Sequence, residues 1–354
     1  MKKITSFLSI FSFLFLLLAS VVNAQLNFYF VNVGMGNATY IELPNGQNAL
    51  IDGGPSVKPI EAFLKSKNIT HIDHVVLTHP HSDHYMGLKK VFKIATVSNF
   101  YDSKAENLNA KGDNNLRALA EAQGSVTYYP KIGEQLNWDN TVNIKVLNTC
   151  ETDTPSRDNG IINNCSIVLK FTYAGQKVLL TADLEEPGEK RVMSRFPASE
   201  LQADVIQAGH HGSKTASSQA FLNAVQPKIA ILSYGTNNKY GFPHYEVVSK
   251  LQAMNVLMYA TNEQTQTLFL KPVTKSVRAA ENVPQIQVKA YDANMPVFTD
   301  ASYFAEESTA ESANVSVEDA ETVEVEMPSL TEVKKSMQGG KSQKSLEKLQ
   351  HFSF

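Results

Sequence analysis

The chain has 354 residues, of which 43% are hydrophobic, and it carries 32 Lys and Arg against 35 Asp and Glu, a formal net charge of −3. This length and apolar content are ordinary for a soluble protein with a large core. The acidic balance excludes a global basic field of the kind that gathers nucleic acid, although it leaves room for a local basic groove.

The first 24 residues have the pattern of a secretory signal peptide. Lys2 and Lys3 precede an apolar stretch over residues 4–18, and small residues at 22–24 would leave Gln25 as the mature N-terminus. The alternative is a retained membrane anchor, but serines interrupt the stretch, which is short for spanning a bilayer. We therefore expect a secreted or periplasmic protein with no integral membrane segment after processing.

Apolar periodicity and turn residues predict alternating strands and helices as far as residue 270. Strands are expected over residues 26–33, 40–43, 49–51, 75–77, 95–101, 126–129, 142–147, 167–169, 178–180, 204–208 and 229–233, around Gly133 and Glu134, and in two last segments ending at Leu270. Helices are expected over residues 58–67, 113–123, 186–196, 216–225 and 245–254.

The densest group of metal-binding side chains follows the apolar run 75–77. His79, His81, Asp83 and His84 occur within six residues. In an extended segment alternate side chains point the same way, so His79 and His81 can bind one ion while Asp83 and His84 turn toward a second. Imidazole nitrogen and carboxylate oxygen together are typical of zinc, manganese and iron sites.

Two further groups of ligand residues follow predicted strands. Asp183 ends the second arm of a predicted hairpin, and the strand over 204–208 runs into His210 and His211. Either histidine can bind a metal, and adjacency alone does not choose between them. The other would then face substrate.

The only two cysteines, Cys150 and Cys165, flank a polar stretch. Because export permits disulfides, we expect a disulfide that pins this loop. Two free buried thiols are the alternative, since connectivity does not follow from sequence alone.

The His-x-His-x-Asp-His loop resembles the signature of the metallo-β-lactamase superfamily. Residues 32–38, 51–54, 163–169 with 178–183, 209–214 and 238–244 are similar to the ComEC/Rec2-type hydrolase domain and to secreted phosphorylcholine esterases. Asn32, Met35 and Asn37 replace two acids and an amide usual in relatives, so charge near the site is lower. The resemblance implies an α/β fold, a four-layer αββα sandwich over residues 25–274 with one or two metals at the sheet edges.

The same resemblance implies a ligand set for two divalent ions, foremost Zn2+ with Mn2+ as the alternative. Asp183 would bridge both ions, with His79 and His81 on the first and Asp83, His84 and His210 or His211 on the second. Most members supply a third histidine to the first ion, and here Asn163 occupies that neighbourhood. Because an amide oxygen is a weaker, harder ligand, we expect a weaker first site that tolerates manganese.

Two adjacent ions can hold a hydroxide between them, which gives a nucleophile at neutral pH. We therefore expect a secreted binuclear-metal-dependent hydrolase, foremost a phosphodiesterase of nucleic acid or a phosphorylcholine-type ester. The expected catalytic residues are Asp83, His84, Asp183 and His244. The expected substrate contacts are Ser213, Lys214, Asn237, Tyr240 and His244, because a lysine and neutral donors suit a phosphate.

Two other functions remain open from the sequence. One is a lactonase or β-lactamase-like amidase, and the other is a catalytically inactive metal-binding surface module. The substrate would be a small molecule or a nucleic acid, and no protein partner can be inferred.

Residues 275–354 differ in composition from the rest of the chain. Residues 305–333 hold nine acidic side chains and no basic one, and residues 334–348 are rich in lysine. Few large apolar residues are present to offset the entropy of ordering. We therefore predict a linker followed by a low-complexity flexible tail.

Overall fold

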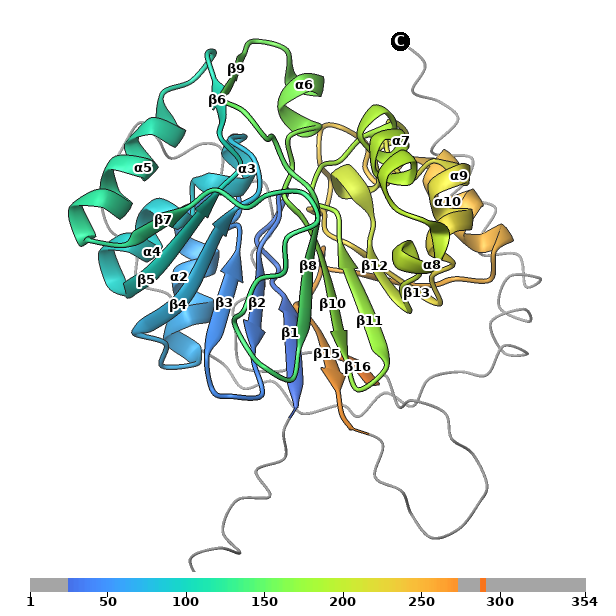
Figure 1. Ribbon diagram of the computed structural model, residues 1–354, viewed down its shortest axis with the longest axis horizontal. Coiled ribbons are helices and arrows are strands. Elements are labelled where there is room, and N and C mark those ends of the chain that lie inside the picture. Colours follow the sequence, from blue (N-terminus) through green and yellow to red (C-terminus); the bar gives the residue numbers. More distant parts are fainter. Residues whose placement is uncertain (1–24, 273–286, 291–354) are drawn as a thin grey trace, which may run out of the picture. The chain divides into compact units, whose positions relative to one another are not determined.

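A computed structural model describes residues 25–272 and 287–290, which form two β-sheets enclosed by helices (Figure 1). The predicted signal peptide lies outside the described residues, and so does the predicted tail apart from residues 287–290. Within the described ranges, no helix combines the length and the apolar character needed to cross a bilayer.

The first sheet has eight strands, and four helices lie on its outer side. In spatial order the strands are β16 (Gln287–Ala290), β15 (Gln266–Leu270), β1 (Leu26–Phe30), β2 (Thr39–Glu42), β3 (Asn48–Ile51), β4 (His71–Leu77), β5 (Thr96–Asp102) and β7 (Val126–Tyr128). Within this sheet, the neighbouring strands β3, β4, β5 and β7 run parallel to one another. The helices are α2 (Val57–Ser66), α3 (Ser82–Tyr85), α4 (Leu88–Ile94) and α5 (Gly112–Gln123).

The second sheet has six strands and its own helical layer. The strands are β14 (Leu257–Ala260), β13 (Ile229–Leu232), β12 (Val205–Gln207), β11 (Gln176–Leu180), β10 (Val168–Tyr173) and β8 (Asn143–Asn148). The helices are α7 (Glu186–Arg195), α8 (Ala198–Leu201), α9 (Gln219–Val225) and α10 (Tyr245–Ala253). A small sheet of β6 (Ala105–Asn107) and β9 (Thr154–Ser156) lies beside α6 (Asn159–Asn163).

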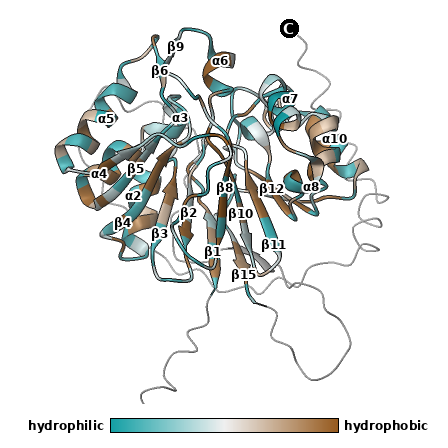
Figure 2. Cartoon of the chain, in the orientation of Figure 1, coloured by the Kyte–Doolittle hydropathy of each residue, from teal (hydrophilic) through white to brown (hydrophobic). Residues whose placement is uncertain are grey.

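Alternating apolar residues divide the interior into layers. Phe28 of β1 packs edge-on against Phe171 of β10, with ring centroids 5.2 Å apart, in the core between the sheets. Tyr29 points the other way and packs on Phe63 of α2, as side chains on the two faces of a strand must. A third core lies between the second sheet and its helices, and Figure 2 shows the hydrophobic colouring along the strands. The predicted four-layer αββα sandwich is confirmed.

Several local predictions differ from the structure. Gly133 and Glu134 lie in a turn rather than a strand, with a single bridge between Gln135 and Lys145. The helix expected from residue 216 begins at Gln219, because the Ser218 side chain accepts a hydrogen bond from the backbone N–H of Phe221. The pattern also missed β6, β9, α3, α6, α8 and β16, which have three to five residues each, too few for a periodic signal. It missed α4 as well, which has seven residues.

Candidate metal centre

The first group of site residues leaves β4 at its carboxyl end. His79 is buried directly after the strand, and the one-turn helix α3 carries Asp83 and His84, so the expected loop contains a helix. The glycine turn before β2 packs against this segment. A Cβ on Gly36 would lie 2.3 Å from the backbone oxygen of Asp83, so only glycine permits this approach.

The second group comes from the ends of two parallel strands, β11 and β12. Asp183 follows β11 after Ala182, whose φ of 47° is in the left-handed region that favours glycine. His210 and His211 follow β12 in a short 3-10 turn, η1 (Gly209–Gly212), and both have positive φ. The geometry of these two turns brings Asp183 and His211 to the same point.

The ligand residues form two groups that share one carboxylate. In the second site, Asp83, His84, Asp183 and His211 place ligand atoms within 4.8 Å of one another. His84 Nε2 lies 3.2 Å from Asp183 Oδ1, and His211 Nε2 lies 3.2 Å from Asp83 Oδ2. In the first site, ligand atoms of His79, His81 and Asp183 also lie within 4.8 Å of one another. His79 Nε2 is 3.0 Å from His81 Nδ1. This arrangement is consistent with the binding of two metal ions.

Two histidines are oriented by hydrogen bonds through their other ring nitrogen. His84 Nδ1 donates to Asp52 Oδ2 over 2.7 Å, and His211 Nδ1 donates to the backbone oxygen of Ser233 over 2.8 Å. Each bond leaves Nε2 with its lone pair toward the centre, as in carboxylate–histidine–metal arrangements. The sequence prediction assigned no role to Asp52 or Ser233, although Asp52 lies in a segment that resembles the family.

The donor atoms fit a metal centre because the protein leaves them without hydrogen bonds. Within residues 25–272, His84 Nε2, Asp183 Oδ1, His211 Nε2 and Asn163 Oδ1 are buried and have no hydrogen-bond partner. Buried polar atoms are normally paired, and their loss of water is costly. Nitrogen and oxygen donors of this kind suit zinc or manganese.

Neighbouring charges set the protonation of the metal-free site. Burial opposes a charge on His211, but Asp183 and Asp83 outweigh it and raise the pKa of His211 to about 9. Burial likewise opposes a charge on His84, yet Asp183, Asp52 and Asp83 hold its pKa well above the ordinary value. Burial, reinforced by His84, lowers the pKa of His79 well below its ordinary value. Protons therefore occupy the second site when metal does not.

This protonation predicts opposite pH dependences for the metal-free and metal-loaded protein. Histidine in the unfolded chain has a pKa of about 6.5, so below this pH the protonated His211 contributes its full stabilisation to the metal-free fold. This contribution is lost as the pH rises through about 9, the pKa of His211 in the folded protein. Metal must displace that proton, so its apparent affinity should increase about tenfold per pH unit for each proton released. Melting temperatures between pH 6.5 and 9 should fall for metal-free protein and rise for loaded protein. A metal-free melting temperature that rises over this range would contradict the assignment.

His210 lies outside both groups of ligand atoms, whereas His211 belongs to one of them. His210 Nδ1 lies 3.1 Å from Glu185 Oε1, and its Nε2 lies 3.8 Å from Asp183 Oδ2. Glu185 also accepts hydrogen bonds from Asn163 Nδ2 and Thr215 Oγ1, both over 3.1 Å. Glu185 precedes α7, and the sequence prediction assigned it no role at the site.

The expected substrate contacts fall into two sets. Ser213 is only 3% exposed, and its Oγ lies 3.0 Å from Thr215 Oγ1, so it braces its own loop instead of facing substrate. Lys214, Asn237 and Tyr240 are exposed. His244 lies outside both ligand groups, and its Nδ1 accepts a hydrogen bond from the backbone N–H of Lys214 over 2.9 Å, which leaves Nε2–H free to donate.

An aromatic side chain that the prediction passed over links this loop to the centre. The ring of Phe242 lies 5.6 Å from that of His210 and 5.0 Å from that of His244. Tyr240, which is 52% exposed, stacks on Phe242 with centroids 5.4 Å apart and planes 16° apart. The rim of the metal centre therefore presents an exposed aromatic face.

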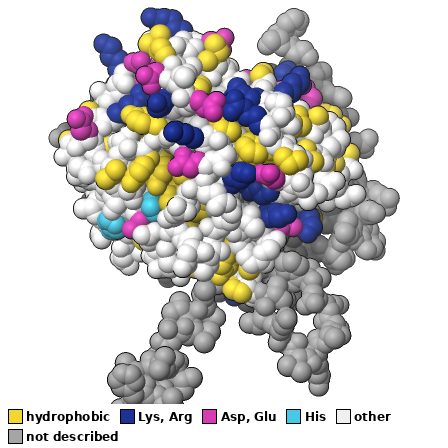
Figure 3. All heavy atoms as spheres, viewed as in Figure 1, with side chains coloured by type: hydrophobic (Ala, Val, Ile, Leu, Met, Phe, Trp, Pro, Cys, Tyr) yellow, Lys and Arg dark blue, Asp and Glu magenta, His cyan; other side chains and the backbone are white. Residues whose placement is uncertain are grey.

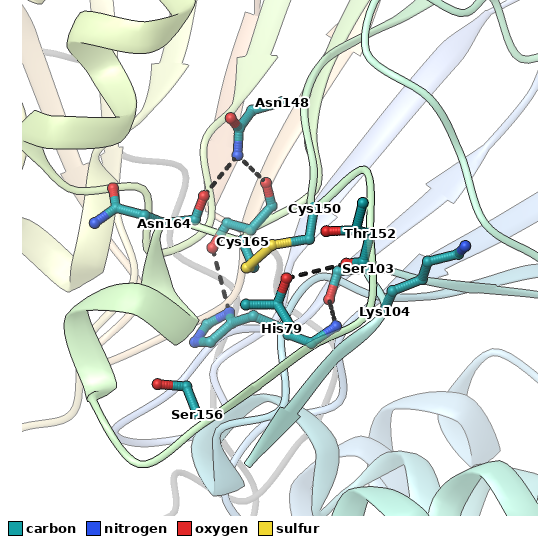
Figure 4. Close-up of a disulfide and its surroundings, with 12 residues drawn as sticks. His79, Ser103, Lys104, Asn148, Cys150, Thr152, Ser156, Asn164 and Cys165 are labelled. Atoms are coloured by element: carbon teal, nitrogen blue, oxygen red, sulfur yellow. Dashed lines mark hydrogen bonds between the residues drawn. A yellow bond between two sulfur atoms is a disulfide. The ribbon is translucent and has the colours of Figure 1, made fainter.

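Cys150 and Cys165 form a disulfide, as expected, with Cα atoms 4.7 Å apart. Figure 4 shows His79 on one side of the bridge and Asn148 on the other. The disulfide thus lies close to a residue of the first site.

Comparison with known proteins agrees with this geometry. The metallo-β-lactamase superfamily model matches residues 31–236. ComE operon protein 3 of Bacillus subtilis is 29% identical over 252 residues, which are 66% of this chain and 31% of that protein. Competence protein ComA of Neisseria gonorrhoeae is 29% identical over 234 residues, 65% of this chain and 30% of that protein. The chain therefore spans less than a third of the length of these relatives.

Two solved structures also resemble the chain. A diphosphatase of the PhnP family aligns with a TM-score of 0.41 and 14% identity over 70% of this chain and 99% of that one. Zn2+-bound PqqB of Methylobacterium extorquens aligns with a TM-score of 0.39 and 10% identity over 65% and 87%. The family model covers more than half of the residues of this chain. The chain therefore belongs to the metallo-β-lactamase superfamily, as a hydrolase that has a His/Asp metal-binding site and is related to the ComEC-type proteins.

Proposed function

We propose that this hydrolase is a binuclear-metal-dependent phosphodiesterase. The observation that carries the proposal is the pair of ligand groups that share Asp183. Their donor atoms His84 Nε2, His211 Nε2 and Asp183 Oδ1 are buried and have no hydrogen-bond partner. Two divalent ions bound here would supply a nucleophile at neutral pH and Lewis-acid stabilisation of the charge that develops on phosphoryl oxygens. Zn2+ is the foremost candidate and Mn2+ the alternative, because histidine, aspartate and one amide suit both.

Each nearby residue then has a task. His79, His81 and Asn163 would hold the first ion, and Asp83, His84 and His211 would hold the second, with Asp183 belonging to both groups of ligand residues. Asp83, which is partly exposed, would also accept the proton of the nucleophile. Glu185 fixes the ring of His210 through Nδ1, so His210 Nε2 can hold or transfer a proton at the leaving oxygen.

The lysines at the rim of the site favour nucleic acid over a phosphorylcholine-type ester, because an aromatic ring alone binds either a base or a quaternary ammonium. Bases stack on exposed aromatic rings, and Tyr240 offers such a ring beside the centre. Lys239 Nζ lies 5.1 Å from the Tyr240 ring and Lys214 is exposed, so both can approach phosphates. Two related proteins are named competence protein ComA and recombination protein 2, and the second name also supports a nucleic-acid substrate.

The approach of such a substrate would depend on local charge. On the face that Figure 3 shows, basic and acidic side chains are interspersed, and the whole chain is acidic. We propose that the aromatic rim, rather than a long-range basic field, selects the substrate. Secretion or a periplasmic location is part of the proposal, and the Cys150–Cys165 disulfide supports it.

Hydrolysis of bis-p-nitrophenyl phosphate tests the reaction class. We expect turnover by protein that is stripped of metal and refilled with zinc or manganese, none by the stripped form, and none by a refilled Asp83→Ala variant. Turnover of a single-stranded oligonucleotide, but not of a choline phosphodiester, would identify the substrate. Absence of phosphodiester turnover with two ions bound would refute the proposal and direct the search to lactones or amides, or to an inactive binding module.

A further inference from the structure

We propose that the Cys150–Cys165 disulfide is a positioning device for the first metal site, and that its reduction empties this site while the second site stays loaded. The inference rests on the proposed binuclear centre. It adds that the two ions depend on different parts of the fold.

The segment closed by the disulfide carries residues that border the first site. Helix α6 lies inside it, and its last residue, Asn163, precedes Cys165 by two positions and offers the unsatisfied Oδ1. The closed segment thus carries Asn163, the expected amide ligand of the first site.

The residue after the disulfide contacts the same site from the other direction. Ser166 Oγ lies 3.4 Å from His79 Nδ1 and accepts a hydrogen bond from the backbone N–H of Asp183 over 3.2 Å. Such contacts to the non-coordinating nitrogen of a ligand commonly change metal affinity by about 10- to 100-fold. A shift of Cys165 would therefore move the adjacent Ser166 and change its contact with His79.

The ligands of the second site are held mainly by other parts of the fold, although Ser166 contacts the backbone of the shared Asp183. Asp83 and His84 are carried by α3, and His211 by the turn after β12. Their orienting partners, Asp52 and the backbone oxygen of Ser233, belong to other strand ends. Asp183, although shared, follows β11, which is paired on both sides by β10 and β12.

The remaining attachments of the segment are weaker than a covalent bond. Asn148 Nδ2 donates to the backbone oxygens of Asn164 and Ser166 over 3.1 and 2.7 Å, and Asp158 caps α6 through the backbone N–H groups of Gly160 and Ile161. Together with the pairing of β9 to β6 and the hydrogen bonds of Asn163 to Glu185 and of Arg191 to the backbone oxygen of Asn164, these bonds hold the segment near its place after reduction. We therefore expect loss of one ion without global unfolding.

The bridge is open to a reductant from one side. A cavity of about 640 Å³ is lined by both cysteines and by Glu151, Arg191 and Arg195. Cys165 is buried, whereas Cys150 is partly exposed. A tertiary phosphine entering this cavity attacks one sulfur, the S–S bond breaks, and water then provides the oxygen of the phosphine oxide and the protons of the two thiols.

The test counts metal ions on folded protein. Full-length mature protein is loaded with zinc, divided, treated or not with a tertiary phosphine, alkylated and desalted, and its zinc per chain is measured by mass spectrometry. We expect two ions in the oxidised protein and one in the reduced protein, with the affinity of the first site reduced by about tenfold or more. A variant with both Cys150→Ser and Cys165→Ser should also retain one ion, and Ile161→Ala, an exposed change in the same loop, should retain two.

The outcomes separate this inference from the proposed function. Fewer than two ions in the oxidised protein would refute the binuclear centre itself. Two ions with unchanged affinities after reduction would overturn the positioning role. Loss of both ions would also overturn it, because the proposal requires the second site to survive. Circular dichroism of the same samples confirms that the fold is intact when the ions are counted.

Discussion

Asp183→Asn is expected to produce the largest loss. Among the described residues, Asp183 is the one that belongs to both ligand groups, and its carboxylate also balances the positive charges of His84 and His211. The amide should therefore weaken both ions and lower kcat/KM by roughly 10³-fold or more, equivalent to about 4 kcal/mol. Metal content and phosphodiester turnover, measured on the same preparation, check this result.

Asp204→Asn provides the matched control for that variant. Asp204 is a carboxylate at the opposite end of β12, where it pairs with Lys228. This variant should keep both ions and full turnover. Two tightly bound ions in Asp183→Asn would contradict the bridging role.

The two adjacent histidines are expected to separate metal binding from proton transfer. His211→Ala should lose the second ion. Replacing a residue that only orients a ligand lowers metal affinity by up to roughly 100-fold, and removal of the ligand itself should lower it by more. His210→Ala should keep both ions but reduce kcat by about 10²- to 10⁴-fold, the range for a lost general acid. Metal titration beside turnover for each variant makes the comparison, and loss of an ion in His210→Ala would reverse the assignment.

The extent of correct fold prediction follows from the length of each element. The paired strands β1, β2 and β3 alternate apolar residues around turn residues, so their pattern is local and visible in the sequence. The strands β6 and β9 have three residues each and pair across almost fifty positions. No local periodicity in the sequence marks such a distant pairing. The segment around Gly133 was predicted as a strand, but in the structure it is a turn followed by a single bridge at Gln135.

The site shows the same contrast between local and distant information. The four expected ligands next to β4 lie within six residues and could be predicted from their spacing. The choice between His210 and His211 depends on the left-handed backbone of η1, which two identical neighbours do not reveal. Asp52 and Glu185 act through partners 32 and 22 residues or more away, so their roles appear only when the strand ends meet.

The binuclear centre is tested most directly by anomalous diffraction from crystals of the zinc-loaded protein, measured above and below the zinc absorption edge. The account predicts two zinc peaks roughly 3.5–4 Å apart, one among His79, His81 and Asn163, the other among Asp83, His84 and His211, with Asp183 contacting both. A single peak, or zinc bound away from Asp183, would contradict it.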